Sequence, residues 1–272
     1  MTKSGWNIRN IIILVAALLV QSGCAAHVPV VQNGDRVGLH YACRLQTGEL
    51  AAATMVKDQT AAKAGIYLPK KDSEPLSLTA GSPESVAAGV RFPSFEDEIA
   101  RRLAVQVVGM RQGESKSMTV VEKKTATDGQ GKLQIARVRV RPKELRISRD
   151  TYMAQKGTAP EVGKEYAIDP LIPGKVESVN DNEVLIRFSA VPGTEVSTPF
   201  GKGTIKSAEY QYEIHIDARP GSLVRSGPMV GKIIKVDDRL ITLDYSNPFG
   251  GEELACDVTV LSVEQQAGQK DK

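Results

Sequence analysis

Gly174-Lys-Val-Glu-Ser-Val179 and Gly231-Lys-Ile-Ile-Lys-Val236 decide the fold, because the second stretch repeats the first 57 positions later. The similarity continues without a gap into the next apolar positions, where Val184, Ile186, Phe188 and Ser189 correspond to Ile241, Leu243, Tyr245 and Ser246. Each copy has the order strand, Asn- or Asp-containing turn, strand and glycine turn, which is typical of a β-hairpin. Chance similarity of two hairpins is the alternative, but the shared glycines and the ungapped spacing favour duplication.

Strands are also predicted on both sides of this repeat. In residues 37–45 apolar and polar side chains alternate, which predicts a half-buried strand. Residues 118–120 and 254–260 show the same alternation. A helix is predicted from Ser94, which is a suitable N-cap with Asp97 three residues on, to Gly109, which is suited to end it.

Composition excludes several classes of protein. The 272 residues carry a net charge of +3, with 41% hydrophobic and 25% charged residues, which are ordinary values for a globular protein. They exclude a disordered chain, a collagen and a polytopic membrane protein. The near-neutral charge gives no electrostatic footprint for nucleic acid. The sequence has no glycine-rich phosphate loop and no metal-binding motif, so we expect no cofactor and no metal.

The first residues have the pattern of an export signal. Lys3 and Arg9 precede an apolar run, residues 11–20, which is too short to span a membrane. The Ser-Gly pair before Cys24 resembles the lipobox of bacterial lipoproteins, although Gln21 replaces the usual Leu. The resemblance implies a signal peptide at 1–23, lipidation of Cys24 and a tether at 24–34. Ala25 after the cysteine favours the periplasmic side of the outer membrane over retention at the inner membrane. Cleavage by an ordinary signal peptidase is the alternative.

Three further stretches together resemble the FKBP-type peptidyl-prolyl isomerases, most closely the SlyD-like branch. The first runs from Val37 to Leu45 and is followed by Thr47-Gly48. The second comprises Pro75-Leu76, Gly81, Phe95-Glu96 and residues 109–114. The third comprises residues 241–244, residues 248–251, Leu254 and residues 257–260.

The resemblance implies an α+β fold in which an FKBP-like antiparallel sheet curls over one short helix. A β-rich insert-in-flap domain, enlarged by the duplicated hairpin unit, interrupts it. The predicted domains are the FKBP-like first part at 35–122, the insert at 123–232, the closing strands at 233–263 and a disordered tail at 264–272.

The resemblance also implies an apolar proline pocket. Position by position, its residues are Tyr41, Leu76, Phe92 and Phe95, with Cys256 at a degenerate position that is Phe in the family. The family's acidic residue falls at Ala52, and its flap tyrosine has no counterpart in 125–129. For Tyr41, Phe92 and Phe95 an ordinary core role is the equal alternative.

Three functions follow from these observations. The first is an exported, lipid-anchored peptidyl-prolyl isomerase that helps exported proteins fold. An apolar pocket can favour the twisted amide without covalent or metal catalysis, although the lost pocket residues predict weak activity. The second is a catalytically degenerate chaperone or assembly protein of the cell envelope. The partners are then unfolded or proline-containing exported polypeptides, together with the membrane through the N-terminal lipid. The third is an envelope scaffold.

Two features are left open by the sequence. The basic strand from Arg137 to Arg149 is either a dock for an acidic partner or lipid headgroups, or a solvated face whose charges discourage edge pairing. Cys43 and Cys256 either form a disulfide in the oxidising periplasm or remain buried thiols.

Overall fold

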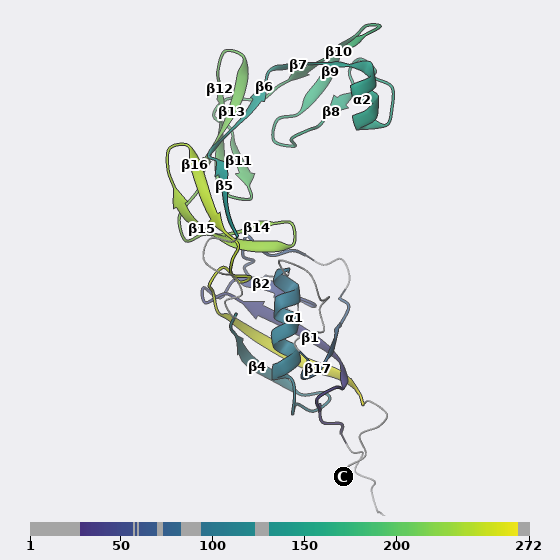
Figure 1. Cartoon of the computed structure of the whole chain (residues 1–272), viewed down its shortest axis with the longest axis vertical. Coiled ribbons are helices and arrows are strands. Elements are labelled where there is room, and N and C mark those ends of the chain that lie inside the picture. Colours follow the sequence, from purple (N-terminus) through teal and green to yellow (C-terminus); the bar gives the residue numbers. More distant parts are fainter. Residues whose placement is uncertain are drawn as a thin grey trace, which may run out of the picture.

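The computed structural model describes residues 28–56, 58, 60–69, 73–82, 94–122 and 131–265. These residues form an elongated molecule with two parts (Figure 1). One part, which we call the base, contains α1 and the five-stranded sheet. The other part, which we call the arm, contains α2 and the twelve strands β5–β16, and it extends from one end of the base.

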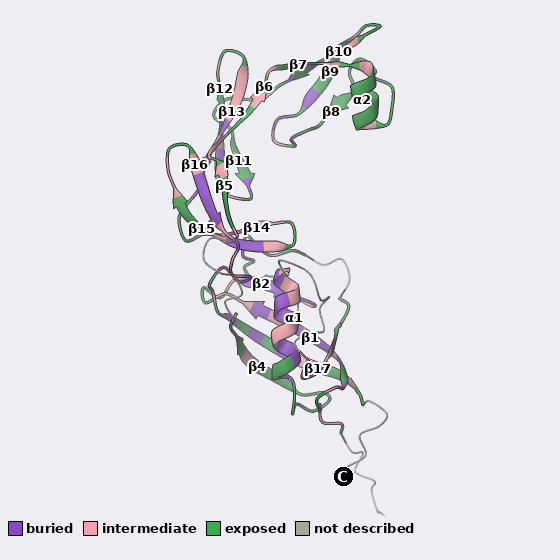
Figure 2. Ribbon diagram, in the orientation of Figure 1, coloured by how far each residue is buried: buried purple, intermediate pink, exposed green. Residues whose placement is uncertain are grey.

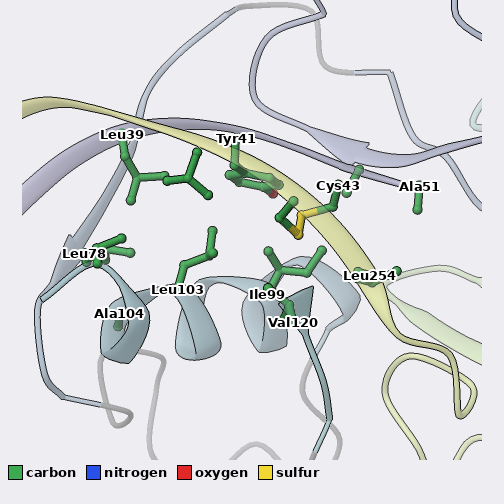
Figure 3. Packing of buried hydrophobic residues seen from close by; sticks show 14 of the residues in the cluster. Leu39, Tyr41, Cys43, Ala51, Leu78, Ile99, Leu103, Ala104, Val120 and Leu254 are labelled. Atoms are coloured by element: carbon green, nitrogen blue, oxygen red, sulfur yellow. A yellow bond between two sulfur atoms is a disulfide. The ribbon is translucent and has the colours of Figure 1, made fainter. Parts of the chain in front are cut away.

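The base is one antiparallel sheet with a helix packed against it. Its strands are β1 Arg36–Arg44, β2 Leu50–Ala53, β3 Leu76–Thr79, β4 Ser115–Val120 and β17 Leu254–Glu264. The sheet has the order β2-β1-β17-β4, and β3 also pairs with β1. Alternate side chains of β1 and β17 point toward the helix, because successive residues of a strand face opposite sides. They form the core of the base, which Figure 3 shows from close by.

Helix α1, Phe95–Gln106, confirms the helix that was predicted after Ser94. The Ser94 hydroxyl accepts a hydrogen bond from the Asp97 amide at 3.0 Å, so it caps the first turn. Phe95, Ile99 and Leu103 lie on one face of the helix and are fully buried against the sheet. The predicted strand at 37–45 is likewise present as β1.

The arm consists of three four-stranded antiparallel sheets of the same design. They are β7-β10-β9-β8, β11-β12-β13-β6 and β14-β15-β16-β5. In each sheet a three-stranded meander is completed by one strand of the continuous segment 132–148. That segment supplies β5 Lys132–Ala136, β6 Val138–Pro142 and β7 Glu144–Ser148, and we call it the spine. The meander strands are β8 Glu165–Tyr166, β9 Gly174–Val179, β10 Glu183–Phe188, β11 Glu195–Thr198, β12 Gly201–Ser207, β13 Gln211–Asp217, β14 Leu223–Ser226, β15 Met229–Val236 and β16 Leu240–Asp244.

The spine changes sheet every six residues. Arg137 separates β5 from β6, and its amide donates to the carbonyl of Arg239 while its own carbonyl accepts from Ile216. Lys143 separates β6 from β7 in the same way, donating to Tyr210 and accepting from Phe188. Each connecting residue therefore bonds to the turn of one sheet and to a strand end of the next. These bonds join the three sheets into one array.

The middle sheet is a third copy of the repeat that the sequence revealed twice. Gly163, Gly193 and Gly221 have φ values of 86°, 85° and 89°, and each is the third residue of a turn closed by an amide-to-carbonyl bond of 3.2 Å. The copies at 174 and 231 both contain a bulge between their paired strands, whereas the pairing of β12 with β13 has none. The middle copy is thus one residue shorter, which displaces its second strand from the ungapped alignment.

Three arginines of the spine, Arg137, Arg139 and Arg141, make contacts between neighbouring sheets. Arg139 lies 2.9 Å from the buried carboxylate of Asp169 in the neighbouring sheet, and Arg141 lies 3.8 Å from it. Arg137 donates to the carbonyls of Ile216 and Asp237. The spine positions equivalent to Arg139 and Arg141 are Leu or Ile in the other two sheets. The interpretation as a solvated face fits Arg146, whose side chain is 57% exposed, whereas Arg139 and Arg141 pair with an acidic residue of the same chain.

The predicted α+β fold class is wrong. Strands make up 47% of the structure and helices 9%, with two helices and several antiparallel sheets, so the protein is mainly β. The second helix is α2, Arg149–Lys156, which caps the distal sheet of the arm. The class was predicted from the resemblance to FKBP-type isomerases with an enlarged insert, but three complete sheets occupy the arm. The predicted domain boundary at 232/233 falls inside β15, whose sheet includes β16 and β5.

Replacing Asp169 with Ala tests the contact between neighbouring sheets. We expect the unfolding free energy to fall by about 1–3 kcal/mol, because Arg139 and the Leu171 amide lose a buried, charged hydrogen-bond acceptor and Arg141 loses its ion pair. Urea denaturation of residues 25–272 measures this, with Asp181→Ala in an exposed turn as the matched control. Equal midpoints for the two variants would contradict the assigned role of Asp169.

Candidate functional site

The structure brings most of the predicted pocket residues together in the core of the base. Tyr41, Phe95 and Cys256 belong to this core, and Leu76 packs against it while partly buried. Phe92 and the predicted lipidation residue Cys24 lie outside the described residues. The predicted site is therefore a real cluster of side chains, but its surroundings differ from those of an open pocket.

The aromatic side chains of this cluster are covered by the arm. Phe95 is fully buried, Tyr41 is 3% exposed, and Phe249 packs edge-on against Phe95 with ring centroids 5.5 Å apart. The guanidinium of Arg225 lies 5.3 Å from the centre of the Phe95 ring. Because Phe249 and Arg225 both come from segments at the root of the arm, the arm itself fills the space beside the two aromatic residues.

Arg225 is fixed in this position by three hydrogen bonds to two residues. Its terminal nitrogens bond to the Glu96 carboxylate at 2.7 and 3.2 Å, and its Nε donates to the carbonyl of Ile66. The side chain is 7% exposed. A two-pronged arginine–carboxylate pair of this kind has a specific geometry and is stronger than a neutral hydrogen bond. Arg225 therefore holds the β14–β15 hairpin against the start of α1.

The backbone at the start of α1 is also occupied. The Phe95 amide donates to the carbonyl of Pro228, in the turn between β14 and β15, at 3.0 Å. The Pro228 ring itself is exposed and does not enter the cluster. The amide that opens the helix is thus unavailable to an external carbonyl, and the hairpin closes the cluster on both its aromatic and its backbone side.

The environment of Tyr41 is apolar and close to acidic groups. Burial raises the pKa of its phenol well above the ordinary value of 10.0, and the nearby Glu96 carboxylate raises it further, while Arg225 acts in the opposite direction. Tyr41 accordingly stays neutral at physiological pH. A neutral, buried phenol suits a packing role and does not supply a base.

Cys256 forms a disulfide with Cys43, which settles the alternative left open by the sequence. The two residues are direct partners in the pairing of β1 with β17, and their Cα atoms are 4.0 Å apart. Figure 3 shows the disulfide in the middle of the base core, between Tyr41 and Ile99. The position predicted as a degenerate pocket residue is therefore a cross-link of the sheet.

A separate, polar pocket lies on the face of the base sheet that is turned away from α1. It has a volume of about 320 Å³, and its lining includes His40, Arg44, Lys116, Asp257 and Thr259. The His40 Nδ1 atom lies 3.1 Å from the Thr54 hydroxyl, and the Ser117 hydroxyl donates to Asp257. These polar side chains bond to one another in the pocket. The alternation at 36–44 predicted a polar outer face, although not the pocket.

Sequence reasoning missed Arg225 and Phe249 as parts of the site. Arg225 contacts Glu96, which lies 129 positions earlier, and no local pattern reports a partner at that distance. Phe249 was noticed within a motif of the resemblance, and its contact with Phe95 was not. A further partner, Glu122, accepts the Phe249 amide at 2.7 Å, and burial raises the pKa of this carboxyl.

Fold and site together define a mainly β protein with a closed aromatic cluster and a three-sheet arm. Neither a scan against protein-family models nor a search of curated proteins found a match. Among the described residues there is no group of three or more His, Cys, Asp or Glu suited to hold a metal ion. In that same part of the chain, no helix is long and apolar enough to cross a membrane.

Tyr41→Phe tests the burial of the phenol. Because the folded-state pKa of Tyr41 is raised, the wild-type protein loses stability as pH rises above the unfolded value of 10.0, and removal of the hydroxyl removes the part of this loss that Tyr41 causes. Urea denaturation from neutral pH to about pH 11 measures the difference. Tyr67→Phe, at a partly exposed tyrosine of the base, serves as the control. A parallel decline in the wild type and Tyr41→Phe would contradict the assignment.

The disulfide is tested by mass and by stability. The unreduced mature chain should weigh two hydrogens less than the reduced chain. The double variant Cys43→Ala, Cys256→Ala should lose about 2–5 kcal/mol of unfolding free energy, because the cross-link restricts the unfolded chain. Detection of two free thiols at these positions in the unreduced protein would show that the bond is not formed.

Proposed function

We propose that this chain is an exported, lipid-anchored helper protein of the cell envelope that binds unfolded polypeptides without prolyl isomerase turnover. One observation carries the choice between turnover and binding, namely the closure of the aromatic cluster by the β14–β15 hairpin. Phe95 and Tyr41 are buried, and Arg225 covers the Phe95 ring.

An isomerase that uses this cluster needs space for a proline ring against the aromatic side chains. In this protein Phe249 and Arg225 occupy that position, and the carbonyl of Pro228 already uses the Phe95 amide. The family's acidic residue is replaced by Ala52, which is buried in the same core. Catalysis depends on contacts made with the twisted amide, so a site without access for the amide provides none of them.

The arm supports a binding function because it exposes apolar side chains along its length. Val191, Val162 and Tyr210 are 72%, 68% and 76% exposed. Within the described part of the arm, the large apolar side chains that are at least 42% exposed are Leu133, Val140, Met153, Val162, Ile168, Val191, Tyr210 and Ile234. Figure 2 shows that exposed segments alternate with buried ones from the root of the arm to its tip. Separate apolar contacts spread over an elongated surface suit an extended polypeptide better than a compact ligand.

The anchor is the part of the proposal that rests on the sequence. The apolar run at 11–20 and the Ser-Gly-Cys pattern that ends at Cys24 support export and acylation, with the outer membrane as the destination. Two acyl chains on one cysteine attach a protein stably to a bilayer without a spanning helix.

Isomerisation and binding are tested on the same preparation of residues 25–272. We expect no acceleration of cis-to-trans isomerisation in short X–Pro peptides, whatever residue precedes proline. The same preparation should bind a permanently unfolded probe, reduced and carboxymethylated lactalbumin, with little dependence on salt because apolar contacts dominate. Isomerisation clearly above the uncatalysed rate would overturn the proposal.

A variant of the arm identifies the binding surface. Val162→Ser, Val191→Ser and Tyr210→Ser combined should weaken binding of the probe by about tenfold or more, since each loses roughly 1 kcal/mol of apolar burial. The matched control combines Ser178→Ala, Ser197→Ala and Ser222→Ala, which alter three exposed serines of the arm. Equal affinities for the two combined variants would reject the arm as the binding surface.

A further inference from the structure

We propose that the end of the base opposite the arm docks on the surface of a phospholipid bilayer and thereby directs the arm away from the membrane. We call this end the pole, and it comprises residues 28–31, 107–113 and 259–261. The inference rests on the proposed anchor at Cys24, and it adds to that anchor a specific contact and an orientation.

Apolar side chains are exposed at the pole. Val28 is 48% exposed and Leu261 is 38% exposed, and both line one shallow groove of about 470 Å³ together with Pro29. Val108, just after α1, is 37% exposed. These three aliphatic side chains have no partner among the described residues that removes them from solvent, so they are available to a bilayer surface.

The proposed lipid anchor at Cys24 is close to these side chains along the chain. Cys24 precedes Val28 by four positions, and four extended residues span at most about 14 Å. From Val28 onward the chain is held on the pole. The Gln112 amide donates to the carbonyl of Pro29 at 2.9 Å, and the Val31 amide donates to that of Met110 at 2.8 Å. A lipid on Cys24 therefore keeps the pole within about 14 Å of the bilayer surface.

Helix α1 separates the pole from the root of the arm. Its first residue, Phe95, contacts Pro228 and Arg225, while the Gly109 amide, just after its last turn, donates to the carbonyl of Val31. Twelve helical residues span about 18 Å. Figure 1 shows the arm leaving the base at the opposite end from the C-terminal end of β17. With the pole at the membrane, the arm points into the surrounding solvent.

Charge does not explain the contact, because the exposed charges around the pole nearly balance. Arg36, Arg111 and Lys116 are exposed, and so are Glu114 and Glu264. Apolar insertion combined with the covalent lipid supplies the attraction, which matches the rule that stable attachment takes two signals. Docking should therefore persist at high salt and on uncharged phosphatidylcholine.

Tryptophan fluorescence provides a direct test. Trp6 is the one tryptophan of the sequence and lies before Cys24, so residues 24–272 carry none. The same chain has three cysteines, of which Cys43 and Cys256 are joined, leaving Cys24 for coupling to a maleimide-bearing lipid. Leu261→Trp reports on the pole, and Val191→Trp, at an aliphatic position of the arm that is even more exposed (72% against 38%), is the control.

On phosphatidylcholine vesicles with brominated acyl chains, we expect at least twofold quenching and a blue shift for Leu261→Trp. Val191→Trp should show neither. Co-sedimentation verifies that both proteins are attached. Lack of quenching at Leu261→Trp, or equal quenching at both positions, would overturn the proposal. Val28→Trp repeats the test at a second position of the pole if Leu261→Trp fails to fold, as judged by its circular dichroism.

The result is independent of the proposed function, because the lipid is supplied chemically. Failure of the cell to acylate Cys24 would be seen in the mass of the membrane-extracted protein, and failure of the arm to bind polypeptide would be seen with the unfolded probe. A further variant, Val28→Ser with Val108→Ser in the Leu261→Trp background, should reduce the quenching at least twofold. Unchanged quenching in that variant would show that the two valines do not contribute to docking.

Discussion

The pairing of β1 with β17 is the constraint on which the rest of the structure depends. It joins the first and last strands of the described chain over nine residue pairs, and the Cys43–Cys256 disulfide cross-links it across a sequence separation of 213. The segment between β4 and β17, which forms the arm, must therefore leave the base and return to it. The arm is therefore connected to the base by two chain segments, and the β14–β15 hairpin lies where the returning segment meets α1.

Within the arm, stability comes from cooperation between sheets. Each meander lacks one strand, and the spine supplies the missing strand to all three. Because the spine changes sheet at Arg137 and Lys143 through backbone bonds, one sheet cannot detach without breaking the closure of its neighbour. The middle sheet and the distal sheet are further joined by Arg139 and Arg141, because both pair with the buried carboxylate of Asp169 in the loop between β8 and β9. Without these cations Asp169 would be a buried charge without a cationic partner, which is costly.

Local patterns predicted the elements well and their assembly poorly. The alternation of apolar and polar side chains predicted β1, and the Ser94 cap with its spaced apolar residues predicted α1. Fold class failed because one shorter copy concealed a whole sheet. The predicted cluster of Tyr41, Phe95 and Cys256 does exist in the core. Its closure was not predictable, because it depends on Arg225 reaching Glu96 across 129 positions, a contact that only the folded chain creates.

The closure of the aromatic cluster and the attachment of the arm to the base depend on the same contact. The hairpin that covers Phe95 is part of the sheet at the root of the arm, where Val230 and Leu223 also pack against the base core. Opening the aromatic cluster would require the Arg225–Glu96 pair to break and these apolar side chains to be exposed, which would loosen the whole arm. Catalysis in the cluster and a firmly held arm are thus competing uses of the same residues. The buried Arg225 favours the held arm, which is the state that the proposed binding function requires.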